Sequence, residues 1–303
     1  MNTILCPAVR AALLIGACLT TGTAAAGTPV DERQAAPPDG SVLVSNLSGE
    51  IVVAGWDRDE VAVTGTLGRN VERLEFVRDG DLTVIEVIYP RDGRSSEGSD
   101  LSIHVPRGSE LEVKAVSARI EVTGVLGRQR LQSVSGNVRT EIVAADVEAE
   151  SVSGNLFATG QDAPTQALLT TVSGRIETEG VSGELEASTV SGRIDAQGRL
   201  LSRARLKTTS GRITLDGGLA EGGRFDIGTT SGEVELMLDH DRDLDVDAQT
   251  FSGDLDNCFG VASTKSRYSP ERSLRIETGE ASRTIRIRAM SGDIEICSGK
   301  PAS

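Results

Sequence analysis

The chain has 303 residues, of which 34 are glycine, nine are proline and 3% are aromatic, so a buried core must be built from small aliphatic side chains. The formal net charge is −14, which repels nucleic acid and anionic lipid surfaces, and no basic stripe with interleaved aromatic residues offsets it. The composition therefore argues against a nucleic-acid-binding protein and suits an elongated β protein made of narrow stacked coils.

Residues 1–26 have the parts of a secretory signal peptide: Arg10, an apolar stretch at 11–19 that is too short to span a bilayer, and three alanines at 24–26 for cleavage. An ordinary N-terminal helix is the alternative. Residues 15–18 loosely resemble a lipoprotein box, so Cys18 is a candidate for lipidation. No later segment is apolar enough for a transmembrane helix. We expect an exported protein, periplasmic or at the cell surface, with or without a lipid anchor.

Residues 27–40 contain three prolines and end at Gly40, which favours a flexible leader. Between residues 41 and 123 the segments 60–63 and 82–87 have strand patterns, but the repeat is loose. We interpret residues 41–123 as an elaborated N-terminal β cap, because a stack of repeats needs a polar cover at its open end.

A pattern of an apolar residue or threonine, then Ser-Gly, any residue, and Ile, Leu or Val occurs ten times. From Ser135 onward the serines are separated by 18, 20, 9, 9, 19, 21, 21 and 39 residues, so the unit is about twenty residues long. Such self-similarity predicts an all-β fold, a β-solenoid over residues 124–299, with a degenerate copy at 116–120. The structural repeat residues are Ser48, Gly49, Ser135, Gly136, Ser153, Gly154, Ser173, Gly174, Ser182, Gly183, Ser191, Gly192, Ser210, Gly211, Ser231, Gly232, Ser252, Gly253, Ser291 and Gly292.

The two-residue period of a strand assigns the faces of one unit. It places Val172, Gly174 and Ile176 inward, and Ser173 and Arg175 outward. We expect a corner or bulge at each Ser-Gly, where glycine permits a positive φ or the close approach of a neighbouring backbone.

The residue after each Gly is expected to form an outward ladder, which consists of Asn137, Asn155, Arg175, Glu184, Arg193, Arg212, Glu233, Asp254 and Asp293. The sequence predicts alternating charge at Arg175, Glu184 and Arg193, as opposed pairs on neighbouring strands favour. Stacking would also gather the acidic residues Glu233, Glu235, Asp254, Asp256, Asp293 and Glu295. Such a cluster is either a solvated face or a patch for a cation or a basic partner.

The chain carries little that indicates catalysis. His104 and His240 lie far apart without a partner at metal-ligand spacing, and the five aspartates between 239 and 247 lack the glycine turn and distal glutamate of a calcium loop. We therefore assign no catalytic residue, no metal and no cofactor. A carbohydrate-active β-helix enzyme, a lyase or glycosidase, remains the alternative, and a cleft with two carboxylates and a nearby aromatic residue would favour it.

Cys258 and Cys297 each lie six residues after a repeat serine, so both occupy the same place in the repeat. Equivalent positions in adjacent coils are ~4.8 Å apart, which a disulfide tolerates. We predict this disulfide, and with it a single coil in the 39-residue step between Ser252 and Ser291, enlarged by a hairpin around Gly279.

Four segments in this order resemble a known family: residues 49–56 (Gly-Glu-Ile-Val-Val-Ala-Gly-Trp), residues 101–109, the Ser-Val-Ser-Gly repeats, and residues 290–296. Together they are similar to the bacterial β-strand-repeat proteins known as “putative adhesins”, the domain of unknown function 4097. The resemblance covers residues 41–297 and implies a β-solenoid in the bacterial envelope, without catalytic residues to transfer. We expect a non-enzymatic scaffold or binding module whose partner, an envelope protein or polysaccharide, is not identified.

Overall fold

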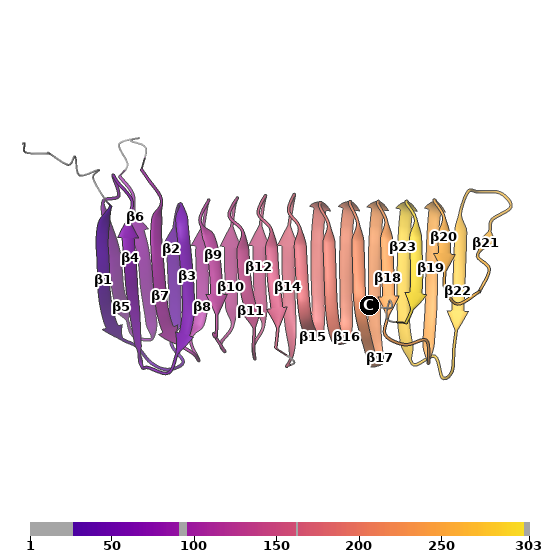
Figure 1. The fold of residues 1–303 in the computed structure, drawn as a ribbon, viewed down its shortest axis with the longest axis horizontal. Coiled ribbons are helices and arrows are strands. Elements are labelled where there is room, and N and C mark those ends of the chain that lie inside the picture. Colours follow the sequence, from indigo (N-terminus) through magenta and orange to yellow (C-terminus); the bar gives the residue numbers. More distant parts are fainter. Residues whose placement is uncertain (1–26, 91–95, 162, 300–303) are drawn as a thin grey trace, which may run out of the picture.

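The computed structural model of the protein describes residues 27–90, 96–161 and 163–299. Within these residues every regular element is a β-strand, and the strands stack into one elongated, solenoid-like body (Figure 1). The prediction of an all-β, solenoid-like fold is confirmed. The expected signal peptide at 1–26 and Cys18 lie outside the described residues. Among the described residues no helix has the length and apolar character needed to cross a membrane.

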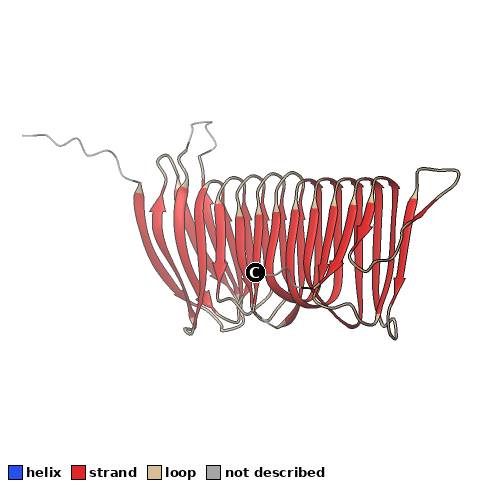
Figure 2. Ribbon diagram, turned by 45° about the vertical axis from the view of Figure 1, so that its right-hand side comes forward, coloured by secondary structure: helices blue, strands red, loops and turns tan. Residues whose placement is uncertain are grey.

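Each coil contributes one strand segment to each of two faces. Face A consists of the segments before the Ser-Gly corners, and face B of the segments after them. Three long strands, β15 (Ile176–Ser191), β16 (Ile194–Ser210) and β17 (Ile213–Ser231), begin on face B and run on into face A. Figure 2 shows the corners as a row of short turns along one edge of the body.

The order of strands along face A, from the N-terminal end of the stack, is β5 (Arg73–Asp79), β6 (Leu82–Ile88), β2 (Ser41–Asn46), β8 (Glu110–Ala115), β10 (Gln129–Ser133), β12 (Val147–Ser151), β14 (Pro164–Thr171), β15, β16, β17, β23 (Arg283–Ser291), β19 (Leu244–Ser252), β22 (Arg272–Glu277) and β21 (Thr264–Lys265). The order along face B is β1 (Thr28–Ala35), β4 (Glu60–Leu67), β7 (Ser99–Pro106), β3 (Gly49–Trp56), β9 (Arg119–Thr123), β11 (Val138–Ile142), β13 (Leu156–Gly160), β15, β16, β17, β18 (Val234–Leu238), β24 (Ile294–Ser298) and β20 (Leu255–Asn257). The pairing is parallel in the middle of the stack. It becomes antiparallel between β1, β4 and β7, between β5 and β6, and between β19, β22 and β21.

The core lies between the two faces and consists of small aliphatic side chains from alternate strand positions. In the coil of β16 and β17, for example, Ala204 and Leu206 of face A and Ile213 and Leu215 of face B are fully buried. Phe225 is the one aromatic side chain among the largest fully buried residues of the described chain. The low aromatic content therefore matches an interior that is only two side chains thick.

Close backbone approach explains the glycine of the repeat. A Cβ on Gly136 would lie 1.8 Å from the carbonyl oxygen of Ala118, and a Cβ on Gly154 would lie 2.0 Å from that of Gly136. The same contact continues along the stack with separations of 1.8 to 2.2 Å through Gly174, Gly192, Gly211, Gly232, Gly292 and Gly253. Of the two reasons expected for this glycine, close approach applies at every one of these corners.

A buried hydroxyl completes several of the corners. Ser133 Oγ accepts a hydrogen bond from Gly136 N at 2.9 Å, and Ser151 Oγ accepts one from Gly154 N at 2.9 Å. Thr171 Oγ1 takes the same position for Gly174 at 3.2 Å. The bond satisfies an amide that the turn leaves without a strand partner, which buried backbone groups require.

Ser182-Gly183 departs from the other repeats. Ser182 is buried, and Gly183 lies inside β15 with a φ of 91° at a register shift against β16. The pair therefore forms the expected bulge rather than a corner, which explains the two nine-residue steps on either side of it. Glu184 consequently faces outward on face A, opposite Gln166 and Arg203, and does not belong to the ladder that follows the corners.

The flexible leader expected at residues 27–40 is wrong. Thr28–Ala35 forms β1, which pairs antiparallel with β4 from Thr28 opposite Leu67 to Ala35 opposite Glu60. Pro29 is tolerated because β1 is an edge strand and one side of its backbone needs no ladder bond. The local sequence contains little strand signal, and the segment forms a strand because it pairs with β4, which lies later in the chain.

The coils at the C-terminal end do not follow chain order. β23 pairs with β17 on one side and β19 on the other, and β24 lies between β18 and β20. The last coil of the chain is thus inserted between two earlier coils, and the yellow β23 stands among the orange strands in Figure 1. The hairpin predicted around Gly279 is wrong, because β22 and β23 lie on opposite sides of β19.

Candidate functional site

An exposed apolar row follows the corners of the solenoid. The residue before each corner serine is largely exposed, and we call these residues the corner ridge: Leu47, Val116, Val134, Val152, Val172, Val190, Met290 and Phe251. Thr209 and Thr230 interrupt the row. Backbone bonds hold its members in line, since Ser135 N donates to Val116 O at 2.7 Å and Ser153 N to Val134 O at 2.8 Å.

The inward placement of Val172 predicted from the two-residue period is therefore wrong. Val172 is 42% exposed, whereas Ile176 is fully buried. The period breaks at the corner, where residues 172–174 form a bend, so the side chains before and after it do not share one alternation. The repeat serines themselves point to solvent at most corners and shape the turn through the backbone rather than as nucleophiles.

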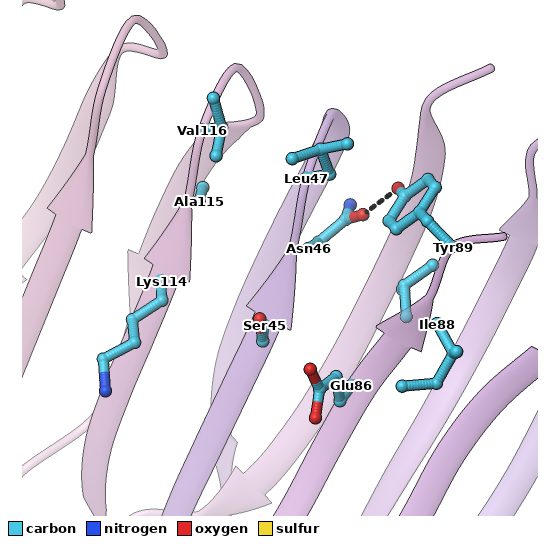
Figure 3. Close-up of a pocket in the computed structure, with 10 residues that line it drawn as sticks. Ser45, Asn46, Leu47, Glu86, Ile88, Tyr89, Lys114, Ala115 and Val116 are labelled. Atoms are coloured by element: carbon cyan, nitrogen blue, oxygen red, sulfur yellow. Dashed lines mark hydrogen bonds between the residues drawn. The ribbon is translucent and has the colours of Figure 1, made fainter. Parts of the chain in front are cut away.

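A shallow groove of 360 Å³ lies over β2 at the N-terminal end of the ridge (Figure 3). Its floor is formed by small residues such as Ser45 and Ala115, with the ridge residues Leu47 and Val116 at the corner. Glu86 and Lys114 stand on either side of Ser45, to which both are register partners. The groove therefore offers one charge of each sign beside an apolar rim.

A hydrogen-bond relay fixes the upper end of this groove. Tyr89 Oη donates to Asn46 Oδ1 at 2.7 Å, and Asn46 Nδ2 donates to the carbonyl oxygen of Ser99 at 2.8 Å. Asn46 is only 2% exposed, so both bonds are made away from bulk water. The relay satisfies a buried amide and positions the Tyr89 ring, and it contains no group that could abstract a proton at neutral pH.

A second groove, of 460 Å³, is lined by carboxylates on face B. Glu177, Glu179, Asp195 and Asp216 line it together with Arg175. Arg175 lies 3.8 Å from Asp195 and 4.0 Å from Glu177, which partly neutralises the cluster. The residues that line this groove include no aromatic side chain. The groove meets only the first half of the criterion that would favour a carbohydrate-active enzyme.

The acidic residues near the C-terminal end gather as the sequence predicts. Glu235, Glu295 and Asp256 are register partners on adjacent strands, and Glu233, Asp293 and Asp254 form the row beside them. The outer members of the second row are paired, because Arg212 lies 2.5 Å from Glu233 and Arg272 lies 2.8 Å from Asp254. Within the described residues, no group of three or more His, Cys, Asp or Glu side chains has an arrangement that could hold a metal ion.

The charge alternation predicted for Arg175, Glu184 and Arg193 is wrong. Ile176 N donates to Arg193 O, and Ile194 N donates to Arg212 O, so Arg175, Arg193 and Arg212 occupy three consecutive rungs of face B. Glu184 is absent from this row because the bulge at Gly183 places it on face A. The neighbouring carboxylates Glu177 and Asp195 supply the opposite charge instead.

The two histidines lie apart in structural settings. The His104 ring lies 4.9 Å from that of Trp56, whose Nε1 donates to Glu60 O at 2.8 Å. His240 lies in the loop between β18 and β19. Of the five aspartates around it, Asp243 accepts a hydrogen bond from Glu280 N at 2.9 Å and so holds the turn before β23.

Cys258 and Cys297 form a disulfide with a Cα separation of 4.8 Å. Cys258 directly follows β20 and Cys297 belongs to β24, so the bond joins the last two coils of face B, as the repeat positions predict. The bond fastens the inserted coil to the coil at the end of the stack.

Comparison with known proteins places the chain in a family. The model of the family described as Toastrack DUF4097 matches residues 57–297, so the chain belongs to this family. A search of the curated proteins found no relative of the chain.

Solved structures are similar to the chain at low sequence identity. A “putative lipid binding protein” from Parabacteroides distasonis is 12% identical, with a TM-score of 0.51 over 89% of this chain and 97% of its own. A “putative adhesin” from the same organism is 11% identical, with a TM-score of 0.49 over 89% of this chain and 98% of its own. A “putative adhesin” from Bacteroides fragilis is 10% identical, with a TM-score of 0.42 over 89% of this chain and 97% of its own.

Proposed function

We propose that this member of the Toastrack DUF4097 family is an exported, non-enzymatic binding module or scaffold of the bacterial cell envelope. The observation that carries the proposal is the stack itself: rigid coils display equivalent outward side chains at a constant spacing of ~4.8 Å over two open faces and one corner ridge. Such an array suits an extended partner that makes the same contact many times, and its repeated contacts add avidity. The partner is an envelope protein or polysaccharide.

Export is supported by two independent features of the chain. Residues 1–26 have the composition of a signal peptide, and Cys258 and Cys297 are placed to bond. Disulfides persist in oxidising compartments and are rare in the cytosol. A lipid at Cys18 would hold the module at the membrane. The descriptions of the similar structures as adhesins or a lipid-binding protein belong to those proteins, and an adhesin-like role is our proposal for this chain.

We also propose that antiparallel strands cap the stack. At the N-terminal end, β1 and β4 close face B and β5 closes face A. At the other end, β22 and β21 close face A, while face B ends in the three-residue β20. Short and irregular edge strands keep parallel sheets from pairing with other chains.

The carboxylate groove supports the alternative, a carbohydrate-active enzyme. It provides four carboxylates within one depression, of which Glu177 and Glu179 are exposed and Asp195 and Asp216 half-buried, and they lie beside Arg175 without an aromatic platform. If this groove were catalytic, changing Glu177→Gln and Asp195→Asn together would abolish release of reducing sugar from envelope polysaccharides. We expect no such release from the unchanged protein.

The proposed function is tested by following the full chain in its host. Fractionation should find the processed protein in the periplasmic or surface fraction, and the purified mature protein should bind washed cell envelopes saturably without changing their polysaccharide. Recovery from the cytoplasm with two reactive thiols would overturn the proposal.

A further inference from the structure

Face A carries a dense group of cations over three adjacent strands. Arg203, Arg205 and Lys207 of β16 point outward, and register pairing places Arg224, Asp226 and Gly228 of β17 beside them. On the far side of β17, Thr284, Arg286 and Arg288 of β23 complete three rows of three positions, which we call the basic grid. Its nine positions contain six cations and a single carboxylate, and the strands on either side add Glu184 and Glu186 of β15 and Asp245 and Asp247 of β19.

Half of these cations lie within hydrogen-bond or ion-pair distance of a carboxylate, and half do not. Arg224 donates to both oxygens of Asp226, at 2.6 and 3.0 Å, and Arg288 donates to Asp247 at 2.7 Å. Arg205 lies 3.8 Å from Glu186. Within the described part of the chain, the remaining three cations, Arg203, Lys207 and Arg286, form no hydrogen bond or ion pair with a carboxylate.

Two cations of the grid oppose each other directly. Arg203 is the direct register partner of Arg224 on one side and of Glu184 on the other, and like charges directly opposite each other destabilise a sheet. Asp226 is attracted to the cations around it: hydrogen bonds from Arg224 lower its pKa below the ordinary value, and the charges of Arg205 and Arg286 act in the same direction. A bound anion would remove this repulsion.

Gly228 leaves an opening in the grid between Lys207 and Arg288. A Cβ at this position would meet only the carbonyl oxygen of Arg288, at 4.0 Å, so packing does not require glycine here. This differs from the corner glycines, where a Cβ would lie about 2 Å from a neighbouring backbone oxygen. The notch allows a ligand group to approach the sheet between cations on either side.

We propose that the basic grid binds a polyanionic polysaccharide, whose repeated acidic groups match a repeated row of cations. The grid has no aromatic or aliphatic anchor among its nine outward positions, which protein interfaces have at their centre. It also lacks the aromatic side chains on which bases stack in single-stranded nucleic acid. The inference rests on the proposed function, because it names the ligand class of an exported binding module.

Binding of the purified, disulfide-bonded protein to dextran sulfate and to polygalacturonate tests the proposal, with neutral dextran as the blank. The decisive variant is Arg203→Gln/Lys207→Gln/Arg286→Gln. We expect it to bind about tenfold more weakly at low salt, and the slope of log affinity against log salt to fall by about one for each cation removed. The matched control is Arg175→Gln/Arg193→Gln/Arg212→Gln, which removes the same charge from face B, where carboxylates surround the arginines.

Two further variants keep the test decisive if the triple variant does not fold. Asp226→Asn removes the only carboxylate of the grid and should strengthen binding, whereas Gly228→Gln fills the notch without a change of charge and should weaken it. Equal loss in both triple variants, equal binding of neutral dextran, or tighter binding of duplex DNA or anionic vesicles would overturn the proposal. Those outcomes leave an envelope location untouched, whereas a cytoplasmic protein with free thiols would refute the proposed function itself.

Discussion

Reduction of the Cys258–Cys297 disulfide is expected to loosen the C-terminal end of the stack and leave the rest intact. The bond closes a loop with a sequence separation of 39 residues, which corresponds to about 4 kcal/mol of loop-closure entropy removed from the unfolded chain. In a repeat protein each coil contacts only its neighbours, so this stabilisation applies to the terminal coils rather than to the whole molecule.

The topology makes these coils depend on one another. β24 pairs with β18 through five residues and with β20 through three, so its departure would leave β18 and β20 about two strand spacings apart, ~9.6 Å. β19 and β20 would then lose their connection to the stack. Freeing the inserted coil therefore exposes the backbones of both neighbours as well.

Hydrogen exchange measured with and without reductant checks this reasoning. A loss of about 4 kcal/mol accelerates exchange up to about a thousandfold for amides that open with the terminal coils. We expect that acceleration in β19, β23 and β24, and unchanged exchange in β10 to β13. The Cys258→Ser/Cys297→Ser variant should reproduce it. A uniform acceleration along the chain, or two reactive thiols in the unreduced, denatured protein, would refute the reasoning.

Three further predictions test the corners, the ridge and the basic grid. Gly192→Ala should cost about 3 kcal/mol in denaturant unfolding, because its Cβ would lie 2.1 Å from Gly174 O, while Ser191→Ala should change stability by less than about 0.5 kcal/mol; equal effects would contradict the close-approach explanation. Val172→Lys on the exposed ridge should be tolerated, whereas Ile176→Lys at the buried position beyond the corner should prevent folding, and a soluble, cooperatively melting Ile176→Lys protein would refute the corner geometry. Arg224 lowers the pKa of Asp226, so the stability that this pair provides is present at neutral pH and is lost as the pH falls through that lowered pKa. The difference in urea midpoint between the native protein and Asp226→Asn should therefore shrink on acidification. A constant difference would disprove the role of the ionised carboxylate.

The repeat could be predicted from sequence because the same contact recurs from coil to coil. A Cβ at Gly154 or Gly174 would meet the backbone of the neighbouring coil, so the same glycine is required at each turn of the solenoid. The disulfide was predictable for the same reason, since Cys258 and Cys297 occupy equal places in two coils that are adjacent both in chain order and in the observed order. What the spacing could not show is the order of coils, because β23 pairs equally well in register with the coil before it and the coil beyond it.

The candidate surfaces were less predictable, because they depend on which strands become neighbours. Arg203, Arg205 and Lys207 occupy alternate positions of one strand, and Arg286 and Arg288 occupy alternate positions of another. Lys207 and Arg286 are separated by 79 residues in the sequence. They share a face only because β23 inserts beside β17. The corner ridge could not be predicted for another reason. A bend interrupts the two-residue period of the strand at residues 172–174, so the period wrongly places Val172 on the inward face.

Both ends of the stack use the same construction, which links the fold to the proposed surfaces. At the N-terminal end, β2 and β3 lie between the coil of β6 and β7 and the coil of β8 and β9, just as β23 and β24 lie between earlier coils at the other end. The first and the last coil in chain order thus each have a neighbouring coil on both sides. Short or antiparallel strands form the exposed edges of the sheets. The C-terminal insertion also brings Arg286 and Arg288 to the side of β17, so the step that secures the end of the solenoid is the step that assembles the basic grid.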